Sequence, residues 1–256
     1  MVRLSLLLTS ALLIGSAVWS APAQRGFGFG GGFGPGMGKV VTGEPYTAAA
    51  TSTSFEKLAN GTTITHNSTI AEARDAEGRT YRCVTIPATG STPASTHTTV
   101  LDPVAHTLTE WGSQSTTATQ IQLPTNPPAN RGSWGGAPGG HGGPGGQGPG
   151  GPGRFHGQVT RTTLAAQTLA GVNADGVKIT TTIPAGAEGN SQPLVSTREI
   201  WTATDLKIVL LETSDSPRDG SHKTEVTSLT PGAPDSTLFQ VPAGYTVKTQ
   251  TRHHGN

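Results

Sequence analysis

The stretch Val177-Lys178-Ile179-Thr180-Thr181-Thr182-Ile183 decides the fold class, because hydrophobic and polar residues alternate along it. Val177, Ile179 and Ile183 fall on one face, and the residues at positions 178, 180 and 182 fall on the other. Such alternation is typical of a half-buried β-strand. Asp175-Gly176 precedes the strand, and this pair supplies the positive φ angles of a tight hairpin. We therefore predict a hairpin turn at Asp175-Gly176, followed by a strand.

The second half of the chain continues in the same manner on the C-terminal side of this strand. The segment Leu206–Leu211 (LKIVLL) is apolar on both faces, which predicts a central strand covered on both sides and the best candidate for the core. The segments 194–201 and 222–229 are predicted to be its neighbours, and Arg218-Asp219-Gly220 is predicted to be a turn. The second half therefore predicts a meander of antiparallel strands.

The first half shows similar punctuation. Asp75-Ala76-Glu77-Gly78 separates the predicted strands 61–74 and 79–86, and Asp102-Pro103 separates 97–101 from 105–111. Short strands every ten or so residues, with no convincing helix, predict a mainly β protein built on a single antiparallel sheet with few or no helices. A short helix at 202–206 or 236–239 is compatible with this pattern.

Glycine and proline are concentrated in two segments. The chain holds 36 Gly and 19 Pro, and a large share lies in 25–38 and 131–157. Such segments cannot bury enough apolar surface to offset the entropy of ordering their backbone, so we predict that both are disordered. The predicted organisation is a Gly-rich leader at 24–41 and a single β domain at 42–250. A disordered loop at 126–157 interrupts this domain, and a flexible tail follows at 251–256. Two separate domains are the alternative.

The first 23 residues predict export. A single positive charge at Arg3, an interrupted apolar run from Leu4 to Trp19 and small residues at Ala21 and Ala23 match the three parts of a secretory signal. We expect cleavage after Ala23, leaving a protein of the periplasm or the extracellular space that does not span a membrane; an uncleaved anchor is the alternative.

Charge and cysteine content narrow the function classes. The formal net charge is +1 and there is no basic run, which argues against a nucleic-acid partner. Cys83 is the only cysteine, so no intrachain disulfide can form, and its place in a predicted strand favours a small buried thiol.

No motif for catalysis, cofactor binding or a metal is recognisable. Nucleophile elbow, zinc motif and phosphate loop are all missing, and Gly26-x-Gly28-x-x-Gly31 follows no strand. We therefore predict no catalytic, cofactor-binding or metal-ligating residue and no cofactor. The sequence leaves enzymatic activity open but favours a protein without it.

Several polar residues could still be brought together by folding. His66, His106 and His222 fall on separate predicted strands and could converge as metal ligands, although solvated histidines are the favoured interpretation. Charge pairs at Arg74-Asp75 with Arg79, and at Arg198-Glu199, are predicted to be structural, and Asp215 and Asp219 are predicted to cap a turn. Trp111 and Trp201 are predicted to be core residues, and Trp134, within glycine, is not.

Two resemblances accompany these patterns. Thr42-Gly43-Glu44-Pro45-Tyr46, the hairpin Arg74-Asp75-Ala76-Glu77-Gly78-Arg79 and the ending Asp235–Tyr245 resemble an uncharacterised family of exported proteins of the acidobacterial type. Tyr81-Arg82-Cys83 departs from that family, which more usually continues with Arg and Glu. The ending Leu238-Phe239, Val241-Pro242 and Gly244-Tyr245 also resembles the periplasmic lipoprotein-carrier half-barrels. The second resemblance implies a single curved sheet, or half-barrel, that holds an apolar ligand in its concavity.

These observations predict a non-enzymatic binding or carrier-type module of the cell envelope, with a lipid or other apolar or amphipathic ligand as partner. The alternative is a structural or surface-interaction protein that acts through its sheet faces and its Gly-rich tracts. A deep apolar cavity on the sheet favours the first, and a filled one the second. Ligand identity and oligomeric state are not encoded in any pattern that we recognise.

Overall fold

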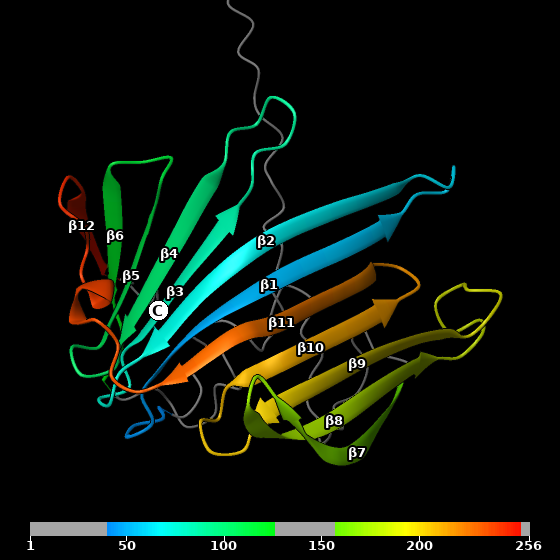
Figure 1. Ribbon diagram of the computed structural model, residues 1–256. Coiled ribbons are helices and arrows are strands. Elements are labelled where there is room, and N and C mark those ends of the chain that lie inside the picture. Colours follow the sequence, from blue (N-terminus) through cyan, green and yellow to red (C-terminus); the bar gives the residue numbers. More distant parts are fainter. Residues whose placement is uncertain (1–39, 126–156, 252–256) are drawn as a thin grey trace, which may run out of the picture.

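The computed structural model describes residues 40–125 and 157–251, which form one open, curved β-sheet (Figure 1). The sheet has twelve strands. Their bounds are β1 Tyr46–Lys57, β2 Thr63–Arg74, β3 Thr80–Ile86, β4 Ser95–Asp102, β5 Thr107–Gly112, β6 Thr117–Gln122, β7 Gln158–Leu169, β8 Val172–Ile183, β9 Leu194–Ala203, β10 Val209–Ser216, β11 Gly220–Pro231 and β12 Thr246–Thr251. The described residues contain no α-helix, and a 3-10 turn, η1, covers Ser236–Phe239. The mainly β prediction is confirmed.

The strand order is β12-β6-β5-β4-β3-β2-β1-β11-β10-β9-β8-β7. The two halves of the chain meet where β1 pairs antiparallel with β11, from Tyr46 opposite Pro231 to Phe55 opposite Ser221 (Figure 1). Strand β12 pairs parallel with β6, and the other pairs of named strands in the described sheet are antiparallel. The polypeptide between β11 and β12 crosses the sheet before β12 begins, and residue alternation within a strand carries no information about its direction.

The buried apolar residues form two clusters, which are located here by the face of the sheet. We call face A the side that carries Tyr46, Ala50 and Ile70, and face B the side that carries Trp111 and Trp201. Alternation along the strands and the pairing register place these residues. The larger cluster joins face A residues of β1, β2 and β11 to residues of β8 to β10. The smaller cluster lies on face B and packs Val100, Trp111 and Ala118 against the η1 segment and Tyr245.

Trp111 and Trp201 are core residues, as predicted, with 8% and 9% of their surface exposed. The Trp111 and Tyr245 rings meet edge to face with centroids 6.5 Å apart, and the Tyr245 hydroxyl donates a hydrogen bond of 3.1 Å to the Gly112 carbonyl. The C-terminal segment is thus fastened over β3 to β6. The η1 turn forms where a short helix was predicted; the other candidate, 202–206, contains a strand end and a turn instead.

Asp175-Gly176 is not a turn, which corrects the prediction from the sequence. Both residues lie inside β8, and the hairpin that precedes β8 turns at Ala170 and Gly171, with φ of 47° and 81°. Gly176 pairs with Trp201, and a Cβ placed on it would lie 2.6 Å from the indole ring. The glycine is therefore required for close approach of a ring, a demand that only the tertiary structure reveals.

The predicted central strand 206–211 begins three residues later than expected. Strand β10 starts at Val209, because Lys207 adopts φ of 55° and the segment before Val209 is a turn. Leu206 and Ile208 are buried all the same, with 6% and 8% exposed, so this segment belongs to the core but not to a strand. Strand β10 lies between β9 and β11, as predicted, although β2 and β1 occupy the middle of the sheet.

The remaining turns agree with their predictions. Asp75–Gly78 connects β2 to β3, and Gly220, with φ of 76°, ends the turn between β10 and β11. Cys83 lies in β3 but is half-buried, whereas a buried thiol was predicted. Most of the predicted disordered segments, 24–39, 126–156 and 252–256, lie outside the described residues, as do the signal segment and Trp134. Within the described part of the chain, no helix has the length and apolar character needed to cross a membrane.

Candidate functional site

Face A carries a band of apolar side chains that crosses the strands in register. Val226 in β11 lies opposite Ala50 in β1, Ala50 opposite Ile70 in β2, and Ile70 opposite Val84 in β3. Leu210 in β10 packs in the same cluster. Neighbouring strands lie about 4.8 Å apart, so a band over five strands is roughly 19 Å long. The result is an elongated apolar strip that runs perpendicular to the strands.

Polar residues border this strip on both sides. On one side the register aligns a row of hydroxyl and carboxyl groups, Glu212, Thr224, Ser52 and Ser68. The Thr224 hydroxyl donates a buried hydrogen bond of 3.2 Å to the Ser52 hydroxyl. On the other side the register aligns Ala48, Glu72, Arg82 and Thr99. The strip is therefore apolar along its length and polar at its margins.

An ion pair lies on each margin. Arg82 Nε donates to Glu72 Oε1 at 2.9 Å, and both side chains are nearly buried, with 9% and 13% exposed. Arg198 Nε donates to Glu212 Oε1 at 2.7 Å, with Glu212 only 9% exposed. Buried charges of this kind are costly unless they are paired and hydrogen-bonded. The two pairs thus hold charge beside the apolar strip.

Glu72 has an unusual protonation equilibrium. Burial raises the pKa of Glu72 from 4.5 to about 7, and the nearby Arg82 guanidinium opposes that rise. Removal from water disfavours the ionised carboxylate, and here the attraction of one guanidinium does not compensate for it. Burial, reinforced by Glu72, also raises the pKa of the Tyr46 phenol. Near neutral pH, Glu72 can therefore exchange a proton beside the strip.

Arg74 lies at the end of β2, one row beyond the margin residue Glu72 on the same face. Its guanidinium donates to the Glu44 carbonyl from Nε at 3.0 Å and from Nη2 at 2.8 Å, and Nη2 also donates to the Leu206 carbonyl at 2.6 Å. The guanidinium carbon stands 4.9 Å from the centre of the Tyr46 ring. Arg74 therefore ties the turn before β10 to the first strand.

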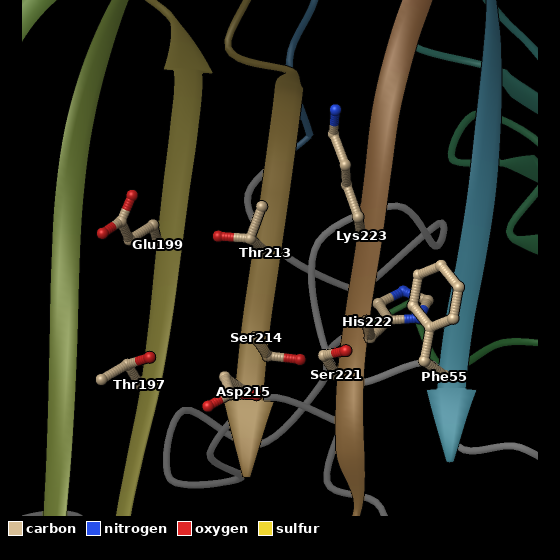
Figure 2. A pocket seen from close by; sticks show the side chains of 9 residues that line it. All are labelled: Phe55, Thr197, Glu199, Thr213, Ser214, Asp215, Ser221, His222 and Lys223. Atoms are coloured by element: carbon tan, nitrogen blue, oxygen red, sulfur yellow. The ribbon is translucent and has the colours of Figure 1, made fainter. Parts of the chain in front are cut away.

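Face B carries a pocket of about 270 Å³ at the ends of β1, β9, β10 and β11 (Figure 2). Two registered rows of face B supply most of its lining, and Ser214 and His222, which the alternation places on face A, complete it at the strand ends. The first runs Thr197, Asp215, Ser221 and Phe55, and the second runs Glu199, Thr213 and Lys223. The sequence analysis named a deep apolar cavity as the feature that favours a carrier. Eight of the nine residues that line this pocket are polar in type, and none of them belongs to the apolar strip.

The three candidate histidines do not form a site together. His66 and His222 both lie opposite Ser54, so they flank it on face A about 10 Å apart across two strand spacings. His106 lies in the turn between β4 and β5 with φ of 54°. Within the described ranges, no group of three His, Cys, Asp or Glu residues could hold a metal ion. Burial lowers the pKa of His222.

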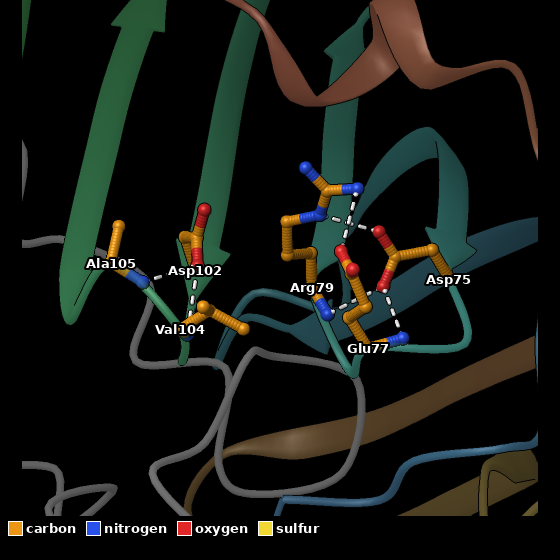
Figure 3. A network of polar contacts seen from close by, with 6 residues as sticks. All are labelled: Asp75, Glu77, Arg79, Asp102, Val104 and Ala105. Atoms are coloured by element: carbon orange, nitrogen blue, oxygen red, sulfur yellow. Dashed lines mark hydrogen bonds and ion pairs between the residues drawn. The ribbon is translucent and has the colours of Figure 1, made fainter.

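Asp75 and Arg79 build the hairpin between β2 and β3 (Figure 3). Asp75 Oδ1 accepts hydrogen bonds from the backbone N–H groups of Glu77 at 3.0 Å and Arg79 at 2.9 Å, and Oδ2 pairs with Arg79 Nε at 2.5 Å. The Arg79 guanidinium also lies 5.3 Å from the centre of the Phe239 ring. These contacts fix the turn and dock the η1 segment, which is a structural role.

The other charged residues that the sequence analysis grouped together have different partners in the structure. Arg198 pairs with Glu212 on face A, whereas Glu199 pairs with Lys178 at 3.0 Å on face B. Asp219 accepts a hydrogen bond of 2.8 Å from the Ser216 hydroxyl and so holds the turn, whereas Asp215 lines the face B pocket. The sequence analysis had assigned both aspartates to turn capping.

Sequence reasoning missed Glu72 and its partner Arg82. The signal was present, because Ile70-Ala71-Glu72-Ala73-Arg74 puts Glu72 on the same strand face as Ile70. A charged residue on an apolar strand face demands a partner, and the hairpin register places Arg82 opposite it.

No family model matches the chain, and no curated protein matches it. The resemblance to an acidobacterial family therefore gains no support. Solved structures similar to the chain include an uncharacterised conserved protein from Thermus thermophilus, with 9% identity and a TM-score of 0.42 over 81% of this chain and 91% of that one. A LolA superfamily protein from Nitrosomonas europaea has 5% identity and a TM-score of 0.31 over 77% and 90%. A lipoprotein-sorting protein domain from Vibrio parahaemolyticus has 6% identity and a TM-score of 0.30 over 76% and 88%. Scores this low do not establish a common fold.

Proposed function

We propose that the protein is a non-enzymatic binding or carrier module of the cell envelope that holds an apolar or amphipathic ligand along the strip on face A. The observation that carries the proposal is the registered row of Val226, Ala50, Ile70 and Val84, bordered by polar rows. A strip roughly 19 Å long and one residue wide fits an extended hydrocarbon chain better than a compact ring.

The margins suit an amphipathic ligand. Arg82 and Glu72 on one side and Glu212 with Arg198 on the other place charges of both signs beside the apolar row. The hydrocarbon chain gains from burial at about 25 cal/mol per Å², and a polar head can reach either margin. The signal-like start of the chain supports a location outside the cytoplasm for such a module.

Ligand entry requires rearrangement. The strip residues Ala50, Ile70, Leu210 and Val226 are 1–7% exposed, so an occupant has to displace the side chains that close over them. Binding that requires such a change is slower than diffusion allows. The same closure is the observation that favours the second candidate, a structural or surface-interaction protein whose strip is simply core.

Competition with cis-parinaric acid, a fluorescent fatty acid, distinguishes the two candidates. The full chain is titrated with the probe, and palmitate and lysophosphatidylethanolamine are used as competitors. A matched pair of variants tests the location: Ala50→Leu fills the strip, whereas Ala49→Leu adds the same bulk to an exposed position on face B of the same strand. Val226→Ala, which shortens one side chain of the strip, serves as a second test if Ala50→Leu does not fold.

A carrier is expected to bind the probe in the wild type and to lose affinity about tenfold in Ala50→Leu, with Ala49→Leu unchanged. Loss of two methyl groups in Val226→Ala is expected to weaken binding several-fold. Absence of binding by the wild-type chain, or equal binding by both leucine variants, rejects the carrier function and leaves the structural role.

A further inference from the structure

The pocket on face B is a regular grid of polar side chains. Asp215 in β10 lies opposite Thr197 in β9 and Ser221 in β11, and Ser221 lies opposite Phe55 in β1. The second row places Thr213 between Glu199 and Lys223. Each row therefore presents one side chain per strand, with the Phe55 ring at one end (Figure 2).

The first row has unused hydrogen-bonding capacity. Among the described residues, Thr197, Asp215 and Ser221 make no side-chain hydrogen bond or ion pair with one another or with a neighbour. Hydroxyls both donate and accept, and a carboxylate accepts through two oxygens. Phe55 is 45% exposed, which leaves an aromatic face open beside them. An aromatic plate next to free donors and acceptors is a surface that can bind a ligand with an apolar face and polar edges.

Charge and size narrow the ligand class. Glu199 is paired with Lys178 and Lys223 with Glu225, so the charges of the second row are satisfied within the sheet. Asp215 disfavours an anion. A volume of about 270 Å³ is below that of typical pockets for drug-sized ligands and suits one small ring. A neutral ring with several hydroxyls meets all of these conditions.

We propose that this pocket binds one neutral hexose unit of a glycan. The apolar face of the sugar ring stacks on Phe55, and its hydroxyls hydrogen-bond to the Ser221 hydroxyl and, through the longer Asp215 side chain, to its carboxylate. The pocket shares no lining residue with the apolar strip, so we expect the two sites to bind independently. The protein would then carry a lipid-type surface on face A and a glycan contact on face B.

Isothermal titration calorimetry of the full chain with cellotriose, maltotriose and chitotriose tests the proposal. Choline is titrated in parallel, because an aromatic ring beside a carboxylate could instead bind a quaternary ammonium. Phe55→Ala and Asp215→Asn remove the two main contacts. Val247→Ala removes an exposed apolar side chain from β12 and serves as the control, since Val247 is 46% exposed and lies at the far edge of the sheet.

At least one trisaccharide is expected to bind the wild type with a dissociation constant in the millimolar range. Phe55→Ala is expected to weaken that binding roughly two- to tenfold, Asp215→Asn by a similar factor, and Val247→Ala not at all. The proposal is overturned if no trisaccharide binds at a concentration of about 20 mM, which is 20-fold above a dissociation constant of about 1 mM. It is also overturned if Phe55→Ala and Asp215→Asn bind the sugar as tightly as the wild type does, or if choline binds and the sugars do not. Fatty-acid binding is expected to be unchanged in Phe55→Ala and Asp215→Asn, which would show that the pocket and the strip bind their ligands separately.

Discussion

Protonation of Glu72 predicts that mild acidification stabilises the protein through this residue. The pKa of Glu72 is 4.5 as an ordinary carboxyl group and about 7 in the folded state, because burial disfavours its ionised form. Between these two values the folded state holds a proton that the unfolded state has released. The free energy of unfolding therefore falls as the pH rises from 4.5 to 7, by about 1.4 kcal/mol per pH unit. The whole interval corresponds to about 3 kcal/mol.

Glu72→Gln isolates this contribution. Glutamine is uncharged at every pH, so the variant lacks the proton exchange while keeping the size of the side chain and an oxygen that can accept from Arg82. The difference in unfolding free energy, wild type minus variant, is expected to fall by about 3 kcal/mol between pH 4.5 and pH 8. Urea denaturation of the full chain at several pH values measures it.

Other groups cancel in this difference. The lowered pKa of His222, which burial causes, and the lowered pKa of Asp235, whose carboxylate accepts hydrogen bonds from Thr237, both make acidification destabilising, with the opposite sign. They act equally on wild type and variant. Glu199→Gln is the matched control, because its half-exposed pair with Lys178 is expected to contribute less than about 1 kcal/mol. A difference curve for Glu72→Gln that is flat, or that rises with pH, would refute the reasoning.

Three further substitutions test the construction of the sheet, each by its effect on the urea midpoint. Gly176→Ala places a Cβ 2.6 Å from the ring of Trp201, so we expect a loss of about 1–3 kcal/mol from overpacking, and a midpoint equal to the wild type would contradict it. Asp75→Ala removes the acceptor of two backbone N–H groups and the partner of Arg79, with an expected loss of about 1–3 kcal/mol; Asp75→Asn should recover part of it. Arg74→Met leaves the buried Leu206 carbonyl and the part-buried Glu44 carbonyl without their donor and should cost about 1–3 kcal/mol. Faster amide exchange confined to residues 203–208 would locate that loss, and unchanged exchange there would argue against the clamp.

Local chemistry predicted the turns well because each turn depends on adjacent residues. Asp75 caps its own hairpin through backbone groups two and four residues away, and Asp102 accepts from the N–H groups of Val104 and Ala105 at 2.8 Å each (Figure 3). An aspartate followed closely by glycine or proline carries that information in the sequence itself. Gly176 failed as a turn signal because its neighbour across the sheet, Trp201, is 25 residues away along the chain.

The contacts of the candidate site also fall into two groups, those that local sequence specifies and those that depend on residues far apart in the chain. Once the turn 75–78 is fixed, the register of β2 and β3 follows, so Glu72 opposite Arg82 could have been predicted from the sequence. The ion pair between Arg198 and Glu212 could not be predicted in this way. It depends on the pairing of β9 with β10, which places Arg198 opposite Ser214 and contains a register shift. The Thr224 to Ser52 hydrogen bond joins residues 172 positions apart. No local pattern specifies such a pairing.

The pairing of β1 with β11 is what makes the apolar strip possible. Ala50, Ile70 and Val84 come from the first half of the chain, and Val226 and Leu210 come from the second. Each half of the chain alone presents only part of the strip. In the separated first half the edge of β1 would be exposed, and in the separated second half the edge of β11 would be exposed. Binding at the strip and docking of the two halves are therefore thermodynamically linked, because a ligand that spans β10 to β3 binds only the joined sheet and stabilises it by mass action. If the strip binds a ligand as proposed, loosening the seam between β1 and β11 is expected to release that ligand. The buried Ser52 and Thr224 hydroxyls lie across that seam and contribute one of its side-chain hydrogen bonds.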